Sequence, residues 1–287
     1  MFLQILMNGL IAGSIYALLA MGFALIYANT KFFNMAHGAM TTVGGYAVYY
    51  LGRELGWNIY PSVVLGVLVA GIMGYLLNLG IFERIKQRKS SNTVLLVASL
   101  GAMIIIQSFV AILFTNQFQT LSDNSSLEKL YNIGSAVVTQ TQVGIFISAV
   151  VIFIALLLVF KFTRFGKMML ATSDDEKVAE IIGVNTRRII RQVFFIGSAI
   201  AGLAGIWVGF DTGLEPIMGM NLLLKGVIAT IIGGLGQIQG AFLGAFLLGL
   251  VENFGIWKIS GEWKDAIAFG LLIIFLLFRP KGILNKK

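Results

Sequence analysis

The chain has 287 residues, of which 57 % are hydrophobic and 12 % charged, whereas ordinary soluble domains contain about 25 % charged residues. This composition excludes an ordinary soluble domain and predicts a membrane protein. Without cysteine and with a single histidine, His37, the chain cannot build a disulfide framework, a cysteine metal site or a histidine cluster, so no metal or other cofactor is expected. The net charge of +8 is interpreted as a signal of membrane topology, without nucleic acid.

The first apolar run, Phe2 to Tyr27, is too long for a signal-peptide core and has no basic stretch before it, so it is interpreted as a retained helix. About 20 apolar residues cross a bilayer as a helix, and lipid leaves the α-helix as the default structure. The candidate segments are 3–27, 34–51, 61–82, 93–115, 140–160, 189–210, 217–232, 240–254 and 266–278. We predict an all-α polytopic fold of eight or nine membrane segments in one domain, residues 1–287.

Basic residues predict the orientation of these segments, because lysine and arginine stay preferentially on the cytoplasmic side. Most of the 21 basic residues fall in 31–34, 83–92, 161–191 and 279–287, which we therefore place in the cytoplasm. The N-terminus is then outside and the C-terminus inside, provided that both short segments around "GGLGQIQG" (233–240) cross. Such glycine-interrupted segments are typical of re-entrant or broken helices, and a hairpin there would change the crossing count by one.

The longest polar interruption is the segment 164–191, where a soluble partner can bind. Ser173 and Glu176 have the spacing of a capping box, the two aspartates between them suit the positive end of a helix, and Gly183 can end it. We expect a two-turn helix there, followed by a membrane helix capped by Asn185 or Thr186. The apolar face of the short helix would consist of Val178, Ile181 and Ile182.

Two glycine-rich stretches resemble each other, "HGAMTTVGG" (37–45) and "KGVIATIIGG" (225–234). Each has a basic residue and a glycine, then a threonine and a glycine pair, although the match needs one insertion. On the predicted topology the first stretch enters from the cytoplasmic side and the second from outside. This arrangement indicates a possible inverted repeat, which is a transporter plan; chance similarity between two glycine-rich helices is the alternative.

A transport pathway must be less apolar than lipid, and polar groups within membranes tend to face the bundle interior. His37 is interpreted as structural rather than as a proton relay, because no intramembrane carboxylate lies near it in the sequence. It follows Asn34 by three residues, so that both can cap or tie the cytoplasmic start of the second helix. The pathway and packing candidates are Asn8, Asn34, His37, Gly38, Thr42, Gln107, Lys225, Thr230, Gly233 and Gly234, with Glu252 and Asn253 as alternatives at the outer mouth.

Four stretches along the chain form an ordered set of motifs: "FNMAHGAMTTVGGY" (33–46), "AEIIGVNTRRI" (179–189), "VIATIIGGLGQIQGAFLGAFLLGLVE" (227–252) and "DAIAFGLLIIFLLFRPKGIL" (265–284). In this order they resemble motifs of the branched-chain amino acid ABC transporter permeases, the LivH family, which is related to urea and short-amide permeases. The resemblance extends over nearly the whole chain.

This resemblance implies a permease subunit that works with several partners. They are a second, LivM-like permease subunit, two cytoplasmic ATP-binding subunits and an extracytoplasmic solute-binding protein. The family's coupling segment corresponds to residues 173–186, where Lys177 and Val178 depart from the usual glutamate and alanine. The residues expected to couple to the ATPase are Ser173, Asp174, Asp175, Glu176, Ala179, Glu180, Gly183 and Asn185.

No phosphate-binding loop of the form Gly-x-x-x-x-Gly-Lys-Ser/Thr occurs, so ATP is expected to be hydrolysed on another chain. No paired catalytic constellation is evident, and no catalytic residue is expected. The sequence therefore predicts the permease subunit of an ABC importer in a bacterial or archaeal cell membrane, moving branched-chain or other small neutral amino acids inward by alternating access. A urea or short-amide permease is the alternative cargo assignment, and an ion-coupled secondary transporter is the alternative class.

Overall fold

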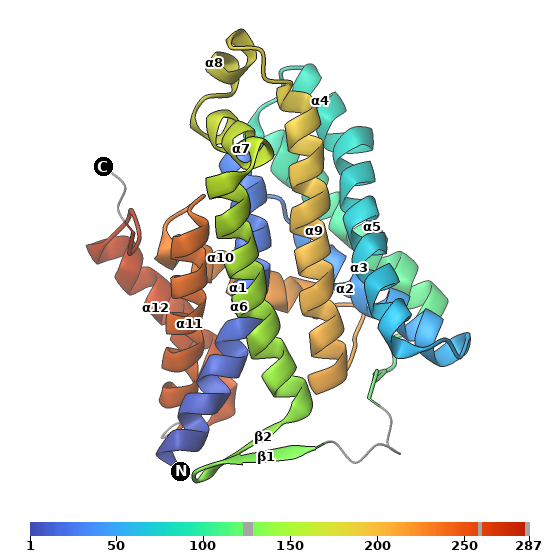
Figure 1. The fold of residues 1–287 in the computed structure, drawn as a ribbon, viewed down its shortest axis with the longest axis vertical. Helices are drawn as coiled ribbons and strands as arrows, with labels where there is room; N and C mark the ends of the chain where they lie inside the picture. Colours follow the sequence, from blue (N-terminus) through green and yellow to red (C-terminus); the bar gives the residue numbers. More distant parts are fainter. Residues whose placement is uncertain (123–128, 258–259, 285–287) are drawn as a thin grey trace.

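The computed structural model describes residues 1–122, 129–257 and 260–284, and it forms a bundle of helices with one two-stranded hairpin (Figure 1). The bundle helices are α1 (Phe2–Thr30), α2 (Ala36–Tyr49), α3 (Ile59–Leu77), α5 (Asn92–Phe114), α6 (Gln140–Phe162), α9 (Thr186–Asp211), α10 (Met218–Gly233), α11 (Ile238–Gly255) and α12 (Lys264–Phe278). Short elements connect or extend them: the π-helices η1 (Tyr50–Glu54) and η2 (Asn78–Phe82), the helices α4 (Glu83–Gln87), α7 (Arg164–Asp174) and α8 (Glu176–Ile181), and the 3₁₀ turn η3 (Gly261–Trp263).

Each of the nine predicted apolar runs is helical, which confirms the all-α polytopic fold. Within the described residues, six helical segments are long and apolar enough to cross a membrane. One of them, Ile59–Gln87, consists of α3, η2 and α4 in direct succession. The helices α2, α10 and α12 are shorter, at 14, 16 and 15 residues. The two glycine-rich stretches that resemble each other thus lie in two of these short helices, α2 and α10, as expected of broken membrane helices.

A β-hairpin that the sequence analysis did not predict lies at the end of the bundle that carries the N-terminus (Figure 1). The strands β1 (Leu130–Ile133) and β2 (Ala136–Thr139) pair antiparallel. Gly134 turns the chain between them at φ +61°, a conformation that glycine adopts without strain. The side chain of Gln4 both donates to and accepts from the backbone of Val137, which ties the hairpin to α1. A strand pair can form here because it lies at the end of the bundle rather than along its apolar length.

The predicted cytoplasmic segments gather at the opposite end of the bundle, where α4, α7 and α8 lie (Figure 1). Asn92 donates a hydrogen bond to the carbonyl of Lys31, and Lys86 forms an ion pair with Glu176. These contacts bring three of the four basic segments together. The fourth, the C-terminal tail, packs against the end of α10, and its last three residues lie outside the described residues.

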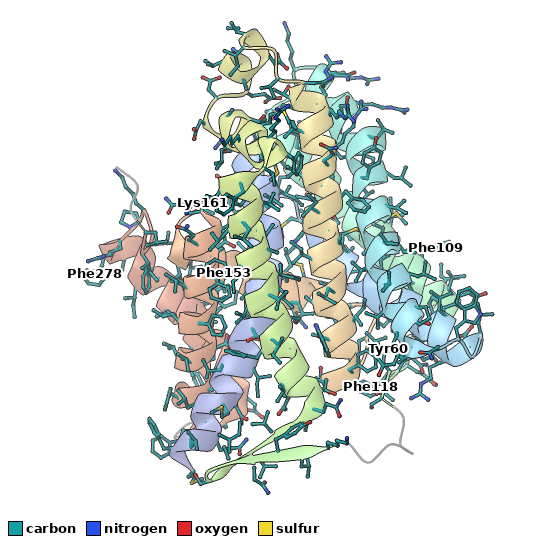
Figure 2. The ribbon with its side chains drawn as sticks, in the orientation of Figure 1. Tyr60, Phe109, Phe118, Phe153, Lys161 and Phe278 are labelled. Atoms are coloured by element: carbon teal, nitrogen blue, oxygen red, sulfur yellow. The ribbon has the colours of Figure 1, made fainter. Side chains whose placement is uncertain are left out.

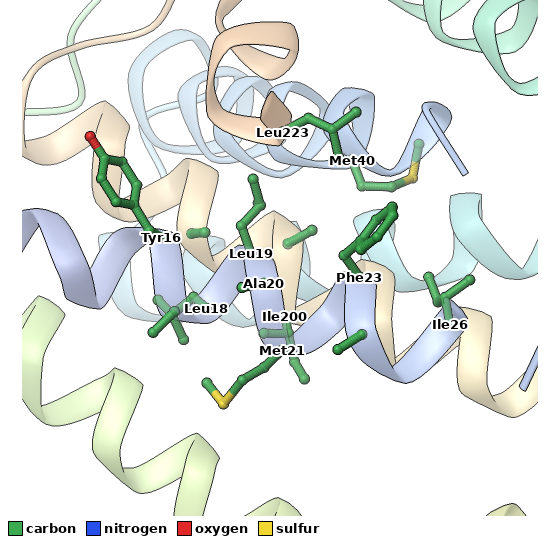
Figure 3. Close-up of a cluster of buried hydrophobic side chains, with 14 of the residues drawn as sticks. Tyr16, Leu18, Leu19, Ala20, Met21, Phe23, Ile26, Met40, Ile200 and Leu223 are labelled. Atoms are coloured by element: carbon green, nitrogen blue, oxygen red, sulfur yellow. The ribbon is translucent and has the colours of Figure 1, made fainter. Parts of the chain in front are cut away.

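The helix α1 forms the centre of the bundle and packs against α6, α9, α10 and α11. Figure 3 shows its middle turns, with Leu19 and Phe23 packed among side chains such as Ile200 of α9 and Leu223 of α10. Small residues permit close helix contacts in membranes, where the hydrophobic effect does not drive helices together. A Cβ atom added at Gly44 of α2, for example, would lie 2.5 Å from the Cα of Gly202 in α9.

The outer helices carry the apolar side chains that contact lipid in a membrane. Figure 2 shows Phe109 on α5 and Phe278 on α12 at the periphery, and both are exposed. Phe153 of α6 instead stacks on Phe242 of α11, with ring centroids 4.0 Å apart. Exposed aromatic and aliphatic side chains of this extent would be a liability in water but suit a hydrocarbon environment.

Replacing Gly205 of α9 by valine should disrupt the packing of α2 against α9. A Cβ atom there would overlap the backbone carbonyl of Thr41, and backbone cannot rotate aside as a side chain can. We expect a loss of stability of about 1–3 kcal/mol, the usual cost of overpacking, seen as a lower unfolding temperature in detergent. Gly101→Val in α5 is the matched control, since an added Cβ meets nothing within 4 Å. Equal unfolding temperatures for the two variants would contradict this close approach.

Candidate functional site

The helix α2 begins in the middle of the bundle rather than at its cytoplasmic end, which corrects the predicted position of His37. The chain leaves α1 at Lys31 and returns through the non-helical residues 32–35 before α2 starts at Ala36. His37 Nε2 lies 3.4 Å from the carbonyl oxygen of Leu19, about 16 Å along α1 from its end at about 1.5 Å per residue. Irregular backbone at membrane depth is tolerated where protein buries it, so α2 is a half-length helix.

Asn34 and His37 do not form the predicted helix cap. Asn34 precedes α2, and the N-cap residue, Met35, makes no side-chain cap. The side-chain oxygen of Asn34 and Nδ1 of His37 are buried without a hydrogen-bond partner among the described residues. The imidazole packs against Gly22 and the ring of Phe23. His37 thus occupies a fully packed position, and its structural role stays a prediction.

The helices α2 and α10 both approach the middle of α1. Thr230 of α10 donates to the carbonyl oxygen of Ala20 at 3.3 Å, one residue beyond the carbonyl that His37 approaches. The start of α2 also meets the start of α10, where Gly38 contacts the backbone of Gly219 and Thr42 donates to the Pro216 carbonyl at 3.5 Å. The two helices that contain the similar stretches are therefore neighbours in the fold.

From this meeting point the two helices run in opposite directions. At the end of α2, Tyr49 donates to Gln119 in the loop on the N-terminal side of the bundle. The turn after α10 lies near the cytoplasmic end of α1, where Gly236 packs on Ala28. Gly234 permits this turn with φ +113°, a region that favours glycine. The opposite directions agree with the inverted arrangement expected from the sequence.

A buried charge cluster joins α1, α10, α11 and α12. Lys225 Nζ lies 2.6 Å from the buried Glu252 Oε1 and 2.7 Å from Oδ1 of Asp265, whose side chain is 77 % exposed at the edge of the cluster. Tyr16 donates its hydroxyl to the other Glu252 oxygen at 2.8 Å. Glu252 is completely buried. Charges within a membrane are costly and pair with one another, so this cluster holds four helices in one arrangement.

The sequence analysis missed this cluster, because it placed Glu252 at the outer mouth and left Lys225 without a partner. The available signal was weak. Both charges interrupt apolar runs and have opposite signs, but the runs are separated by a turn whose geometry the sequence does not specify. The neighbouring Asn253 is not part of the cluster, and its side chain donates to the carbonyl of Gly249 within α11.

The remaining pathway candidates do not converge on one place. Asn8 is exposed near the start of α1 and accepts a hydrogen bond from Gln4. Gln107 lies on α5, with its amide nitrogen buried and without a partner in the described part of the chain. Gly233 ends α10, where its backbone approaches that of Gly240 at the start of α11. These positions lie on separate helices.

The segment between α6 and α9 folds into two helices that meet at Asp175, which corrects the predicted capping box. Ser173 lies inside α7 and donates to the carbonyl of Leu170. Asp175 caps α8, because its Oδ1 accepts from the backbone N–H groups of Lys177 and Val178. A carboxylate combines the capping hydrogen bond with a favourable interaction at the positive end of the helix, whereas Ser173 bonds within its own helix.

The end of α8 agrees with the sequence analysis. Gly183 follows the helix with φ +89°, and Asn185 caps α9 by accepting from the backbone N–H of Arg188. Thr186 donates to Glu180 Oε1 at 2.6 Å. These contacts fix the short helix to the start of α9.

The helix α8 turns one face toward its own chain and the other toward water. Ala179 is 1 % exposed, so a partner cannot contact its side chain directly. Ala179 can affect a partner only by fixing the position of the helix. Asp174, the last residue of α7, is exposed. The apolar side chains of the outward face are Val178, Ile181 and Ile182, which are 53 %, 83 % and 69 % exposed.

Two ion pairs connect this cytoplasmic segment to α4. Lys86 Nζ lies 2.5 Å from Glu176 Oε2, at the start of α8. Arg191 of α9 binds both carboxylate oxygens of Glu83 at 2.7 Å, the bidentate geometry that strengthens such pairs. The first pair joins α8 to the membrane segment Ile59–Gln87, and the second joins α9 to the same segment.

Comparison with known proteins identifies one matching family, several relatives and a solved structure with a similar fold. The family described as branched-chain amino acid transport system / permease component matches residues 5–276. The high-affinity branched-chain amino acid transport system permease proteins LivH of Escherichia coli K12 and BraD of Pseudomonas aeruginosa are 31 % and 32 % identical, each match covering 99 % of this chain and 96 % of the relative. Among solved structures, PsaBC from Streptococcus pneumoniae in complex with Fab has a similar fold, with a TM-score of 0.54, 14 % identity and coverage of 96 % and 91 % of the two chains.

Removing Lys225 alone should destabilise the protein more than removing Lys225 and Glu252 together. Lys225→Met leaves a fully buried carboxylate without its closest cation, and breaking a buried pair costs about 3–5 kcal/mol. The double variant Lys225→Met/Glu252→Met removes both charges and should recover much of that loss. Thermal unfolding of the purified variants in detergent measures the difference. A double variant at least as unstable as Lys225→Met would contradict the mutual compensation of the two charges.

Proposed function

The chain belongs to the family of branched-chain amino acid transport system permease components, and we propose that it is a membrane subunit of an ABC importer of neutral amino acids. The observation that carries the proposal is α8, a short helix on the cytoplasmic end of a membrane bundle with three exposed apolar side chains. Exposed apolar patches in water mark interaction surfaces. The proposed occupant of this surface is an ATP-binding subunit, since this chain has no phosphate-binding loop of its own.

The proposed transmission of movement starts at α8. When the ATPase displaces the helix, the ion pair of Glu176 with Lys86 carries the displacement to α4 and α3. The hydrogen bond of Thr186 to Glu180 carries it to α9, which packs against α1, α2 and α3. Rigid movement of these helices against a second, LivM-like permease subunit would open the pathway alternately to the two sides of a bacterial inner membrane.

The proposed cargo is a branched-chain or similar neutral amino acid. The names of LivH and BraD support this assignment by family membership, and an extracytoplasmic binding protein would supply most of the selectivity. Urea or a short amide is the alternative cargo. Competition of each solute against labelled leucine uptake distinguishes them.

The proposed energy source is ATP rather than an ion gradient. Proton-coupled transporters relay the proton through carboxylates or histidines inside the membrane that change partners during the cycle. The buried carboxylate of Glu252 is held by Lys225 and Tyr16 in a network that joins four helices. His37 contacts a carbonyl and apolar groups instead of an acid. Both observations favour structural roles for these residues.

Replacing Ile181 by aspartate tests the proposed docking surface. The change removes the most exposed apolar side chain of α8 and should cost about 2 kcal/mol of interface burial, or about 30-fold in affinity for the ATPase. Co-purification of the ATP-binding subunits with the permease measures the effect. Ile133→Asp in β1, also an exposed isoleucine but at the opposite end of the bundle, is the matched control. Equal ATPase recovery with both variants would refute the docking surface.

Replacing His37 by glutamine should leave much of the transport activity, with no new pH dependence. Glutamine can still donate to the Leu19 carbonyl that the imidazole approaches, and it cannot carry a proton. Uptake by the assembled complex between about pH 6 and 8, across the usual titration of histidine, provides the measurement. Complete loss of uptake in a normally assembled complex would mean that the imidazole takes part in the transport cycle.

A further inference from the structure

A cavity of about 180 Å³ lies at the cytoplasmic end of the bundle, between the end of α1, the segment formed by η2 and α4, the start of α5, and the pair α8 and α9. Phe32, Phe82 and Leu95 provide apolar wall, and charged side chains from α4, α8 and α9 provide the rest. The cavity is separate from the cluster around Lys225, and the transport mechanism described above does not use it as a site.

Two polar side chains at this cavity form no hydrogen bond or ion pair among the described residues. Asn78 in η2 is only 3 % exposed, yet its amide group makes no hydrogen bond there. Buried amides are nearly always hydrogen-bonded. Arg187 is exposed, and its charge interacts with that of Glu83 without forming a hydrogen bond or ion pair in the described part of the chain. Asn78 belongs to a π-helix, a distortion frequent at functional sites, and both groups are available to a ligand.

The charges around the cavity are balanced. Glu83 forms a bidentate pair with Arg191, and Lys86 pairs with Glu176. Outside these two pairs the wall carries one basic and one acidic side chain, Arg187 and Glu180. A bare anion would be repelled by Glu180 and a bare cation by Arg187. The ligand chemistry that fits is therefore a zwitterion.

We propose that this cavity binds a zwitterionic amino acid with a small apolar side chain from the cytoplasm. Its carboxylate would bind the Arg187 guanidinium, which suits carboxylates in a bidentate geometry. Its ammonium group would bind Glu180, which accepts a hydrogen bond from Thr186 and, as a carboxylate, has further acceptor sites. The amide of Asn78 would bind either end, and the apolar wall the side chain. A volume of about 180 Å³ is below the range of about 300–1,000 Å³ for drug-sized ligands, as expected for so small a molecule.

Binding at this place would slow import, because the ligand would connect η2 and α4 to α8 and α9. The proposed function, on which this inference rests, passes the displacement of α8 through these elements, and a ligand held between them would stabilise their present arrangement against that displacement. A ligand that prefers the connected arrangement shifts the equilibrium toward it. The amino acid delivered to the cytoplasm would thus inhibit its own uptake.

The experiment measures the initial rate of labelled leucine uptake by the complete transporter in vesicles with ATP inside and binding protein outside. The vesicles contain either no leucine or unlabelled leucine. Internal leucine should reduce the wild-type rate about fivefold, at the lower end of typical allosteric couplings. The variants Asn78→Leu and Arg187→Gln, on different elements, should both lose this inhibition while their rates in empty vesicles stay near that of the wild type. The matched controls Asn8→Leu and Arg188→Gln should remain inhibited.

An unchanged wild-type rate with internal leucine would overturn the inference and leave the proposed function intact, since ATP-driven uptake is seen in the same assay. Inhibition that persists in both cavity variants would also overturn it. If vesicles that contain ATP and no leucine take up no labelled leucine, the proposed function itself is refuted, and the inference with it.

A zwitterionic phospholipid headgroup has the same combination of charges, so the lipid is varied as well. Vesicles made only of phosphatidylglycerol offer no zwitterionic headgroup. Inhibition by internal leucine in these vesicles would assign the cavity to the amino acid. A transport rate that depends on added phosphatidylethanolamine and not on internal leucine would assign the cavity to the lipid and refute the amino acid site.

Discussion

The inability of lipid to form hydrogen bonds is the constraint on which the rest of this structure depends. Each polar group within the bundle must find a protein partner or lie in a close packing contact. The chain meets this requirement by bringing small residues of α1, α2, α9, α10 and α11 into backbone contact. It also pairs the Glu252 carboxylate with Lys225 and with a hydrogen bond from the Tyr16 hydroxyl. Two half-length helices can therefore begin at the middle of the bundle without exposing their ends to lipid.

The cytoplasmic end uses charge in a different way. The Lys86–Glu176 pair is partly exposed, with side-chain exposures of 43 % and 33 %, and exposed pairs contribute at most about 1 kcal/mol. The Arg191–Glu83 pair is more buried and bidentate. The contact of α8 with α4 is therefore weaker than the contact of α9 with α4. The cavity between these pairs lies where a small ligand would stabilise the present arrangement of α4, α8 and α9.

Much of the fold was predictable from the sequence, because apolar length and glycine-rich interruptions follow directly from the membrane. The runs, the end of α8 at Gly183 and the cap at Asn185 depend on local chemistry and were predicted correctly. The spacing of Ser173 and Glu176 predicts a capping box with Ser173 as the cap of α8, and only the fold shows that Asp175 is used. The level of His37 in the bundle and the partner of Lys225 depend on contacts between distant segments, which no local pattern encodes.

The central claim is that the polar groups buried in this chain are structural and that the energy for transport enters at α8. Leucine uptake by the assembled complex in vesicles, driven either by internal ATP or by an imposed proton or sodium gradient, tests this claim most directly. The account predicts uptake with ATP and none with either gradient alone. Gradient-driven uptake without ATP would contradict it, because a buried group such as Glu252 or His37 would then have to carry the coupling ion.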